Sequence, residues 1–298
     1  MSYRSVLRCL RPSQSMAHAT AARCERAEDT NAGDIALASE ENRENAMKSY
    51  AISAAAIGLA VMLAPAAADA AEIKVISSVG VKGALEELKP QFERATEHKL
   101  NITYGTIVPL KRQIDGGEAF DVVILTPAVV EDLAKAGKVA AGTSAVVAKA
   151  GIGVAIRAGS PKPDIGTPEA FKKTLLAAKS IAYSKEGQSG IAMARLMERL
   201  GIADEMKPKT VLETRSGMTA ANVVEGKAEL AFVLISEILP IAGAENAGPL
   251  PAELQSYIVF SAGISPGAKD AAAAKSLIDF LKAPGAAPVY KAKGLEPG

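Results

Sequence analysis

Short apolar runs alternate with segments of helical periodicity along residues 72–298, and this alternation limits the fold more than any other feature of the sequence. Runs such as 73–76 (IKVI) and 230–234 (LAFVL) are continuously apolar or nearly so, which is typical of strands buried on both faces of a parallel sheet. Repetition of such strands with intervening helices indicates an α/β, doubly wound architecture. Further strands are predicted at residues 101–104, 121–125, 180–183 and 210–213.

Two extended segments interrupt this repetition. Residues 151–157 (GIGVAIR) and 255–262 (QSYIVFSA) are predicted to cross between two strand–helix sets, and a helix at 271–282 is predicted to pack back on the first set. We therefore expect a two-lobed α/β clamshell, each lobe a mostly parallel sheet flanked by helices, with ligand bound in the crevice between the lobes. The predicted first lobe comprises residues 72–153 and 255–298, and the second comprises 154–254.

A charged start, an apolar stretch and a run of small residues precede the first strand, in residues 47–71 (MKSYAISAAAIGLAVMLAPAAADAA). This order predicts a secretory signal peptide cleaved near Ala70 or Ala71, and therefore a periplasmic protein. A membrane anchor is the alternative, but the apolar stretch is shorter than the roughly 20 residues that a spanning helix needs. Residues 1–46 are then either a disordered extension or the result of a start assigned upstream of Met47.

The composition argues against several chemistries. Both cysteines, Cys9 and Cys24, precede the predicted signal, so we expect no disulfide, thiolate chemistry or metal site in the mature chain. Its one histidine, His98, is expected to lie on the surface at the end of a helix. A single histidine gives no support to a zinc hydrolase or a Ser-His-Asp hydrolase, which need further site residues beside it. Charges of both signs are mixed along the chain, which gives nucleic-acid binding no support. We expect a monomer without a cofactor.

Several predicted strands end in small or hydroxyl-bearing residues that lead directly into a helix. A helix N-terminus carries free N–H groups and a partial positive charge, so it suits an anion. Any one Ser or Thr there is more often a helix cap than a ligand contact, but their joint occurrence predicts an anion site. The four segments are 77–80 (SSVG), 105–108 (GTIV), 184–190 (SKEGQSG) and 214–218 (TRSGM). The candidate ligand-binding residues are Ser77, Ser78, Gly80, Thr106, Ser189, Gly190, Arg215 and Ser216.

Arg215 stands at the start of a predicted helix, where a guanidinium could clamp a carboxylate through two hydrogen bonds. A surface salt bridge is an equally good interpretation, because such pairs are common. Other cations lie near the predicted cleft in sequence, and most of them are expected to be solvated: Lys82, Lys111, Arg112 and Lys185.

Five segments carry a family resemblance: IKVISSVGVKGALEEL, LKRQIDGGEAFDVVIL, SGIAMARLMERLG, VVEGKAELAFVLISE and SLIDFLKAPGAAPVYKAKG. In their order and spacing, over residues 72–290, the chain resembles the periplasmic molybdate-binding proteins of ATP-binding-cassette (ABC) importers and the wider class of type II solute-binding proteins. The resemblance implies a receptor that captures a small anion between its lobes and passes it to the membrane permease of an ABC importer.

The ligand loops depart from that family. Molybdate binders present a serine where this chain has Gly80, a serine-rich loop around Thr106, and a tyrosine where it has Leu234. Arg215 occupies a position that is usually acidic in them. These changes favour an organic carboxylate over molybdate. The backbone donors of the third and fourth loops correspond to Ser189, Gly190 and Ser216.

An enzyme on the same scaffold is the second hypothesis, because fold does not fix function. Some exported proteins similar to molybdate binders are isomerases of aconitate, which move a double bond by removing and returning a proton. Such chemistry needs a general base and cationic groups near the carboxylates, and Arg215 suits the cationic role. Candidate bases are Glu186, Tyr104 and Glu237.

Overall fold

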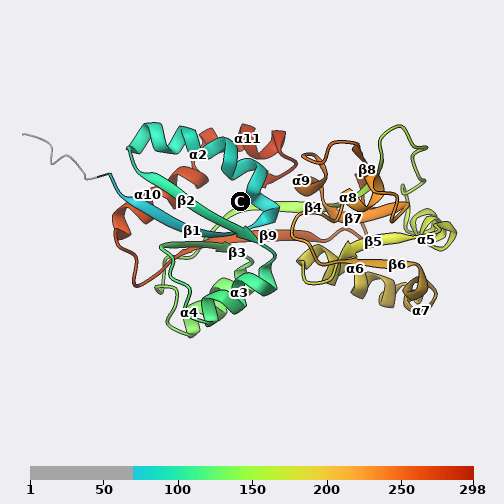
Figure 1. Cartoon of the computed structure of the whole chain (residues 1–298), viewed down its shortest axis with the longest axis horizontal. Helices are drawn as coiled ribbons and strands as arrows, with labels where there is room; N and C mark the ends of the chain where they lie inside the picture. The colour runs from blue at the N-terminus through green and yellow to red at the C-terminus, as the bar shows by residue number, and fades with distance from the viewer. Residues whose placement is uncertain (1–69) are drawn as a thin grey trace, which may run out of the picture. The chain divides into compact units, whose positions relative to one another are not determined.

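The computed structural model describes residues 70–298 (Figure 1). The predicted extension at 1–46 and nearly all of the predicted signal at 47–71 lie outside the described residues. Within the described part, none of the helices has both the length and the apolar character needed to cross a membrane.

One mixed sheet runs through the described residues in the strand order β2-β1-β3-β9-β4-β7-β5-β6, and β8 and β10 also pair with β4. We define the first lobe by β1, β2, β3, β9 and β10, and the second by β5 to β8. The bounds are β1 Glu72–Ser78, β2 Lys99–Gly105, β3 Val122–Leu125, β4 Ala145–Arg157, β5 Ile181–Ser184, β6 Thr210–Glu213, β7 Leu230–Leu234, β8 Ala244–Pro249, β9 Tyr257–Ile264 and β10 Glu296–Pro297.

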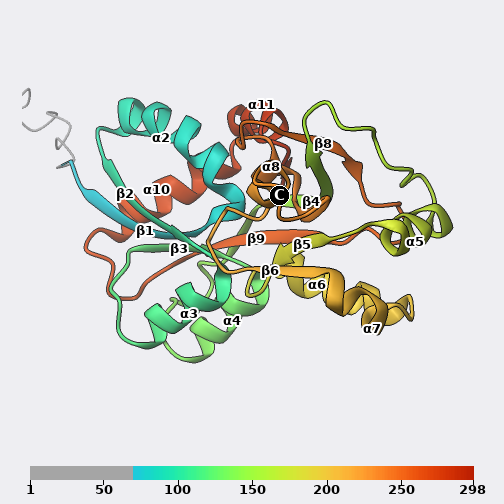
Figure 2. The same cartoon turned by 45° about the vertical axis from the view of Figure 1, so that its right-hand side comes forward.

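The core of each lobe is parallel and the connection between the lobes is antiparallel. β1 pairs in parallel with β2 and β3, and β5 pairs in parallel with β6 and β7. The first half of β4, residues 145–151, pairs antiparallel with β9, and residues 152–155 pair antiparallel with β7. β4 therefore belongs to both lobes, and Figure 2 shows it and β9 running between them. This arrangement confirms the predicted two-lobed α/β fold.

Helices cover both faces of the first lobe. In Figures 1 and 2, α2, α10 and α11 lie on one face and α3 and α4 on the other. The first lobe holds the helices η1 Val79–Val81, α2 Lys82–Thr96, α3 Ile107–Asp115, α4 Pro127–Lys135, α10 Ala271–Lys282, η3 Pro284–Ala286 and α11 Ala287–Ala292. The second lobe holds α5 Pro168–Ala177, α6 Gln188–Arg199, α7 Ala203–Met206, η2 Lys207–Lys209, α8 Ala221–Val224 and α9 Ile235–Ile238.

Aromatic pairs anchor helices to their neighbours in each lobe. In the first lobe, the Phe92 and Phe280 rings of α2 and α10 meet edge to face with centroids 5.4 Å apart. In the second, Phe171 of α5 meets Phe232 of β7 in the same way at 5.8 Å. Edge-to-face pairs at these distances stabilise a core beyond their buried area, by about 0.5–1.5 kcal/mol each.

Two local expectations differ from the structure, and one strand was not predicted. His98 is buried, not on the surface, because the chain turns inward at the left-handed residue Glu97 and the His98 Nδ1 accepts the Ala71 N–H at 3.1 Å. β4 begins at Ala145, before the predicted residue 151, because pairing with β9 extends it. β8 (AENAGP) has no apolar pattern and forms by pairing with β4.

Asp121 joins three segments of the first lobe through hydrogen bonds. Its carboxylate accepts the Lys74 N–H of β1 at 2.7 Å and the Lys269 N–H of the segment before α10 at 2.9 Å. Its own carbonyl accepts the Ser265 N–H at 2.9 Å. Because the side chain is buried, the Lys74 and Lys269 N–H groups depend on its carboxylate for a partner.

Replacing Asp121 with Asn should lower the free energy of unfolding by about 1–3 kcal/mol, because one carboxylate oxygen becomes an NH2 group that faces another donor. Urea denaturation followed by circular dichroism measures this change. Asp132→Asn, on the exposed surface of α4, is the matched control and should change stability by less than about 0.5 kcal/mol. Equal midpoints for Asp121→Asn and the wild type would contradict the structural role of Asp121.

Candidate functional site

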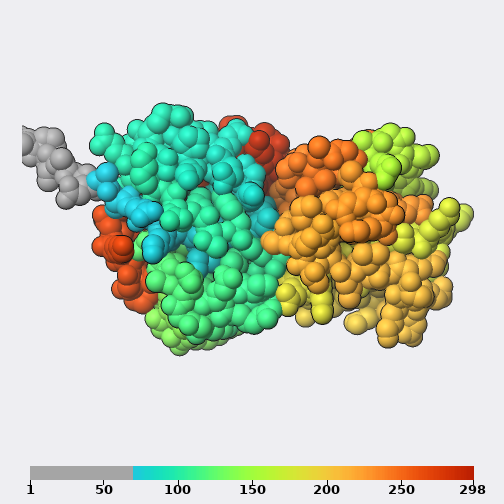
Figure 3. Space-filling model, in the orientation of Figure 1, coloured from blue at the N-terminus to red at the C-terminus, as the bar shows by residue number. Residues whose placement is uncertain are grey.

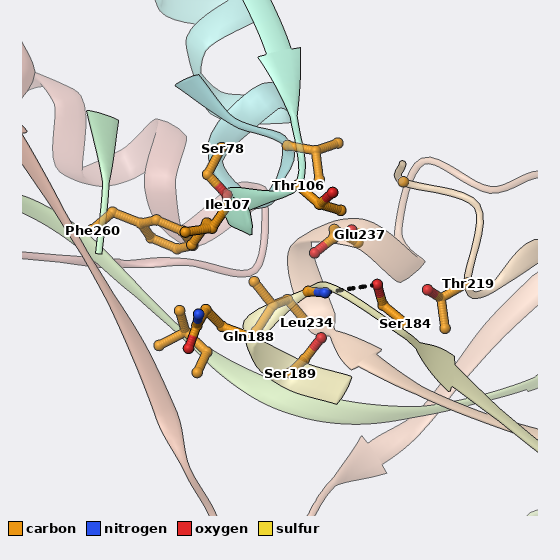
Figure 4. A pocket seen from close by; sticks show the side chains of 14 residues that line it. Ser78, Thr106, Ile107, Ser184, Gln188, Ser189, Thr219, Leu234, Glu237 and Phe260 are labelled. Atoms are coloured by element: carbon orange, nitrogen blue, oxygen red, sulfur yellow. Dashed lines mark hydrogen bonds between the residues drawn. The ribbon is translucent and has the colours of Figure 1, made fainter. Parts of the chain in front are cut away.

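A narrow pocket lies where the two lobes meet, and hydroxyl groups dominate its polar lining (Figure 4). Ser78 ends β1 and Thr106 follows β2 in the first lobe. Ser184 ends β5, Ser189 lies in the first turn of α6, and Thr219 lies between β6 and α8 in the second lobe. The cavity measures about 20 Å³, which is room for about one water molecule.

The five hydroxyl groups are able to donate to a bound group. Ser78 Oγ accepts the Gly80 N–H at 3.3 Å, and Ser184 Oγ accepts the Gly187 N–H at 2.9 Å, so both keep their protons available. Thr106 directly precedes α3 but forms no side-chain capping bond to it. Within residues 70–298, none of the five hydroxyls donates a hydrogen bond. The pocket therefore presents several free donors to whatever enters it.

Two helix starts and an apolar wall complete the pocket. Ile107 begins α3 and Gln188 begins α6, and both residues line the cavity. The free N–H groups at such helix starts add partial positive charge. Leu234, Ile258 and Phe260 form an apolar part of the lining, and a less polar environment strengthens hydrogen bonds made there. Neither Lys nor Arg is among the described residues that line this pocket, so an anion would meet neutral donors.

Glu237 adds a carboxyl group to the pocket. It lies in α9, directly after β7, and Figure 4 shows its side chain among the hydroxyl-bearing residues. The residue is half-buried, and no hydrogen bond or ion pair from residues 70–298 reaches its carboxyl group. Burial raises the pKa of Glu237 to about 7. Near neutral pH the group is therefore divided between its neutral and charged forms and can give or take a proton.

The predicted ligand residues that carry a hydroxyl divide into two groups. Ser78, Thr106 and Ser189 line the pocket. Ser77 is buried and donates to the Ser78 carbonyl at 3.3 Å, while Ser216 lines a neighbouring cavity. The structure therefore brings together hydroxyls from three of the four predicted strand ends.

Gly80 and Gly190, also predicted as ligand residues, are not among the residues that line the pocket, and both allow close packing beside it. A Cβ on Gly190 would lie 1.8 Å from the Ser184 carbonyl oxygen, so the start of α6 can approach the end of β5 only with glycine at this position. A Cβ on Gly80 would lie 2.7 Å from both Leu234 and Phe260. Both glycines shape the pocket by letting its walls come together.

Arg215 does not reach the pocket, because two carboxylates engage its side chain. Its Nη2 lies 2.7 Å from Glu213 Oε2 and 3.2 Å from Glu225 Oε2. Glu213 is buried and also accepts Asn222 Nδ2 at 2.9 Å. Hydrogen bonds from Arg215 lower the pKa of Glu213 to about 2. The salt-bridge interpretation of Arg215 thus describes the structure, and the predicted carboxylate clamp does not.

The remaining candidate bases lie outside the pocket. The Glu186 carboxylate pairs with Arg112 of α3 at 2.6 Å, an ion pair that joins the two lobes beside the pocket. Burial raises the pKa of Tyr104, so its hydroxyl stays protonated. Of the three candidates, only Glu237 lines the cavity.

Ser184 and Thr219 are pocket residues missing from the sequence-based set. Ser184 belongs to the predicted segment 184–190, and Thr219 directly follows 214–218, so a slightly wider window at the same strand ends would have included both. Phe260 carries no such signal, since it reaches the pocket only because β9 crosses between the lobes.

Comparison with known proteins identifies the family of the chain. Residues 73–296 match the family described as bacterial extracellular solute-binding protein. The chain belongs to this family. The solute-binding protein is 30% identical over 255 residues to the molybdate-binding protein ModA of Azotobacter vinelandii, covering 83% of this chain and 98% of that protein.

The chain is also similar to an enzyme and to a solved binding protein. An aconitate isomerase of a Pseudomonas species is 29% identical over 231 residues, which cover 76% of this chain and 87% of that enzyme. The solved periplasmic molybdate-binding protein of Azotobacter vinelandii aligns with a TM-score of 0.64 and 26% identity, covering 75% of this chain and 98% of that structure. These matches confirm the resemblance to molybdate-binding and other solute-binding proteins that the five sequence segments indicated.

Glu213→Gln should lower the free energy of unfolding by about 1–3 kcal/mol at pH 7. The new NH2 group of the glutamine would face N–H donors whose hydrogen bonds the carboxylate accepts in the wild type. The folded pKa of about 2 lies below the ordinary 4.5, so the stabilisation is complete above pH 4.5 and is lost as pH falls toward 2. Urea denaturation between pH 7 and pH 2.5 should therefore show a flatter pH dependence in the variant.

The matched control for that series is Glu205→Gln, on the exposed surface of α7, which should follow the wild-type pH dependence. An unchanged pH dependence in Glu213→Gln would show that the Glu213–Arg215 pair does not stabilise the fold.

Proposed function

We propose that this solute-binding protein captures a small anion in the hydroxyl-lined pocket and passes it to the membrane permease of an ABC importer. The observation that supports the proposal is the meeting of five hydroxyl groups from both lobes in one pocket without a Lys or Arg in its described lining. Neutral donors can hold an anion through charge-assisted hydrogen bonds, which are about twice as strong as neutral ones.

Export and a monomeric state belong to the same proposal. Cleavage after Ala70 would keep the first hydrogen bonds of the described fold, in which the Ala71 carbonyl accepts the Lys99 N–H at 2.8 Å and the Ala71 N–H donates to His98. Cleavage after Ala71 would remove these two bonds. A periplasmic monomer would then meet both the solute and the permease.

The ligand we propose is an organic carboxylate, with molybdate as the alternative. Gly80 and Leu234 carry no hydroxyl where molybdate-binding proteins present one, and both pack against other residues in this structure. Arg215 no longer supports a carboxylate ligand, since its guanidinium is paired with Glu213 and Glu225. The argument therefore depends on the missing hydroxyls and on the shape of the site.

A thermal-shift panel of molybdate, tungstate, sulfate, citrate and both aconitates tests the proposal directly. A ligand at a hundred times its Kd stabilises the folded state by about 2.7 kcal/mol, which gives a clear rise in Tm. Thr106→Val and Ser189→Ala should each lower the affinity for the anion about tenfold to a hundredfold, because each removes one hydrogen bond to a charged group.

Ser276→Ala, which removes a hydroxyl within α10, is the control and should leave affinity unchanged. Absence of any shift in the wild type, or equal affinities in the pocket variants and the wild type, would refute anion capture at this site.

A second candidate function, isomerisation of a tricarboxylate, is favoured by one observation. Glu237 places an unpaired carboxyl group with a pKa near 7 in a pocket suited to anions, where a fixed negative charge would oppose binding. As a base, the Glu237 carboxylate would take a proton from the carbon next to the double bond of aconitate. Return of that proton at the far end of the three-carbon unit would shift the double bond, with no net gain or loss of atoms.

Glu237→Gln should abolish interconversion of cis- and trans-aconitate while retaining anion binding, because Gln cannot accept the proton. The charged form acts as the base, so wild-type turnover should rise with pH through about 7 and then level off. The opposite trend is expected for binding, which should weaken above pH 7 as Glu237 becomes negative. Chromatographic separation of the two isomers measures turnover, and a wild-type rate no higher than that of buffer would exclude the isomerase.

A further inference from the structure

A second cavity lies beside the pocket and is much larger. Its volume is about 380 Å³, and Val79, Gly217 and Glu237 line both cavities. We call it the second chamber. Like the pocket, it draws its lining from both lobes, with the start of α2 on one side and residues 216–218 and α9 on the other. Figure 3 shows the first lobe, in teal and green, meeting the orange second lobe along this junction.

The lining of the second chamber is chemically different from that of the pocket. Met218 and Ile241 provide apolar surface. Lys82, the first residue of α2, provides a cation, and its ammonium lies 5.5 Å from the centre of the Tyr104 ring. Within residues 70–298 no carboxylate lies within ion-pair distance of Lys82, so its charge is available. Glu86, one helical turn along α2, also lines the chamber and opposes that charge.

The two cavities differ in what they can hold. A pocket of about 20 Å³ admits no more than one small group without moving its walls. A chamber of about 380 Å³ falls within the usual range for small-molecule sites. Glu237, Val79 and Gly217 stand at the boundary, and Gly217, in a left-handed conformation with φ of 72°, adds no side chain there.

We propose that the ligand is an elongated aliphatic polycarboxylate that occupies both cavities. One carboxylate lies among the hydroxyls of the pocket, the carbon chain passes Glu237, and a second carboxylate faces Lys82 in the second chamber. This inference rests on the proposed capture of an anion in the pocket and adds the class of that anion. A compact tetrahedral oxyanion would leave the second chamber, and Lys82, without a role.

Isothermal titration calorimetry with tricarballylate, a saturated tricarboxylate that cannot isomerise, tests the inference, with molybdate and acetate as compact anions. Lys82→Met should lower the affinity for tricarballylate about tenfold, and Glu86→Gln should raise it about twofold to threefold, because the two changes alter the local charge in opposite directions. Lys89→Met, two turns further along α2, is the matched control and should leave affinity unchanged.

Each outcome separates the inference from the proposed function. Opposite effects of Lys82→Met and Glu86→Gln on tricarballylate, with any compact-anion affinity unchanged, would support the two-cavity site. Tricarballylate affinity that is equal in both variants and the wild type would overturn it, and so would binding of compact anions alone, while anion capture would stand. If the wild type bound none of the three anions, the proposed function would fail, and this inference with it.

Discussion

Backbone hydrogen bonds along β4 hold the two lobes together as one sheet. Residues 145–151 pair with β9 of the first lobe, and residues 152–155 continue directly into pairing with β7 of the second. A strand shared in this way fixes which strand ends face each other, because the parallel strands of each lobe are registered against it through β9 and β7. The meeting of Ser78 and Thr106 with Ser184 and Ser189 follows from that registration.

The sequence predicted those strands whose position depends on their own residues. Continuous apolar runs located the parallel strands, and β6 and β7 begin and end where predicted, because burial on both faces demands such residues. β8 was missed because its residues AENAGP carry no apolar pattern and become a strand only through the partner that tertiary structure supplies. The early start of β4 has the same cause, since its pairing with β9 joins residues more than a hundred positions apart.

The site was predictable to the same extent. Hydroxyl residues at strand ends are visible in the sequence, and three of those predicted reach the pocket. Arg215 was ambiguous because its partner depends on Glu225, which lies ten residues away, directly after α8, and on how deeply Glu213 is buried. The pKa of Glu237 could not be inferred at all, because its cause is burial by parts of both lobes.

The pocket combines two features that oppose each other when an anion is bound. Its hydroxyls and helix starts attract negative charge, whereas Glu237, once ionised, repels it. A carboxyl group whose pKa lies near 7 removes this repulsion in its neutral form, in which it is able to donate a hydrogen bond to the anion. Occupancy of the site by an anion would therefore be thermodynamically linked to protonation of Glu237, in a receptor and in an enzyme alike.

The Ser236 hydroxyl of α9 donates to the Gly80 carbonyl at 2.7 Å, and Gly80 packs tightly against Leu234, so the lobes bind each other directly beside the pocket. These contacts compete with any solute, because a cavity of about 20 Å³ must widen before a carboxylate can enter it. If the lobes must separate before a solute enters, an affinity measured in solution equals the intrinsic affinity of the open form multiplied by the fraction of molecules that are open. The contacts between the lobes would then oppose binding, and a ligand would bind only if its own contacts with both lobes were more favourable than those it replaces.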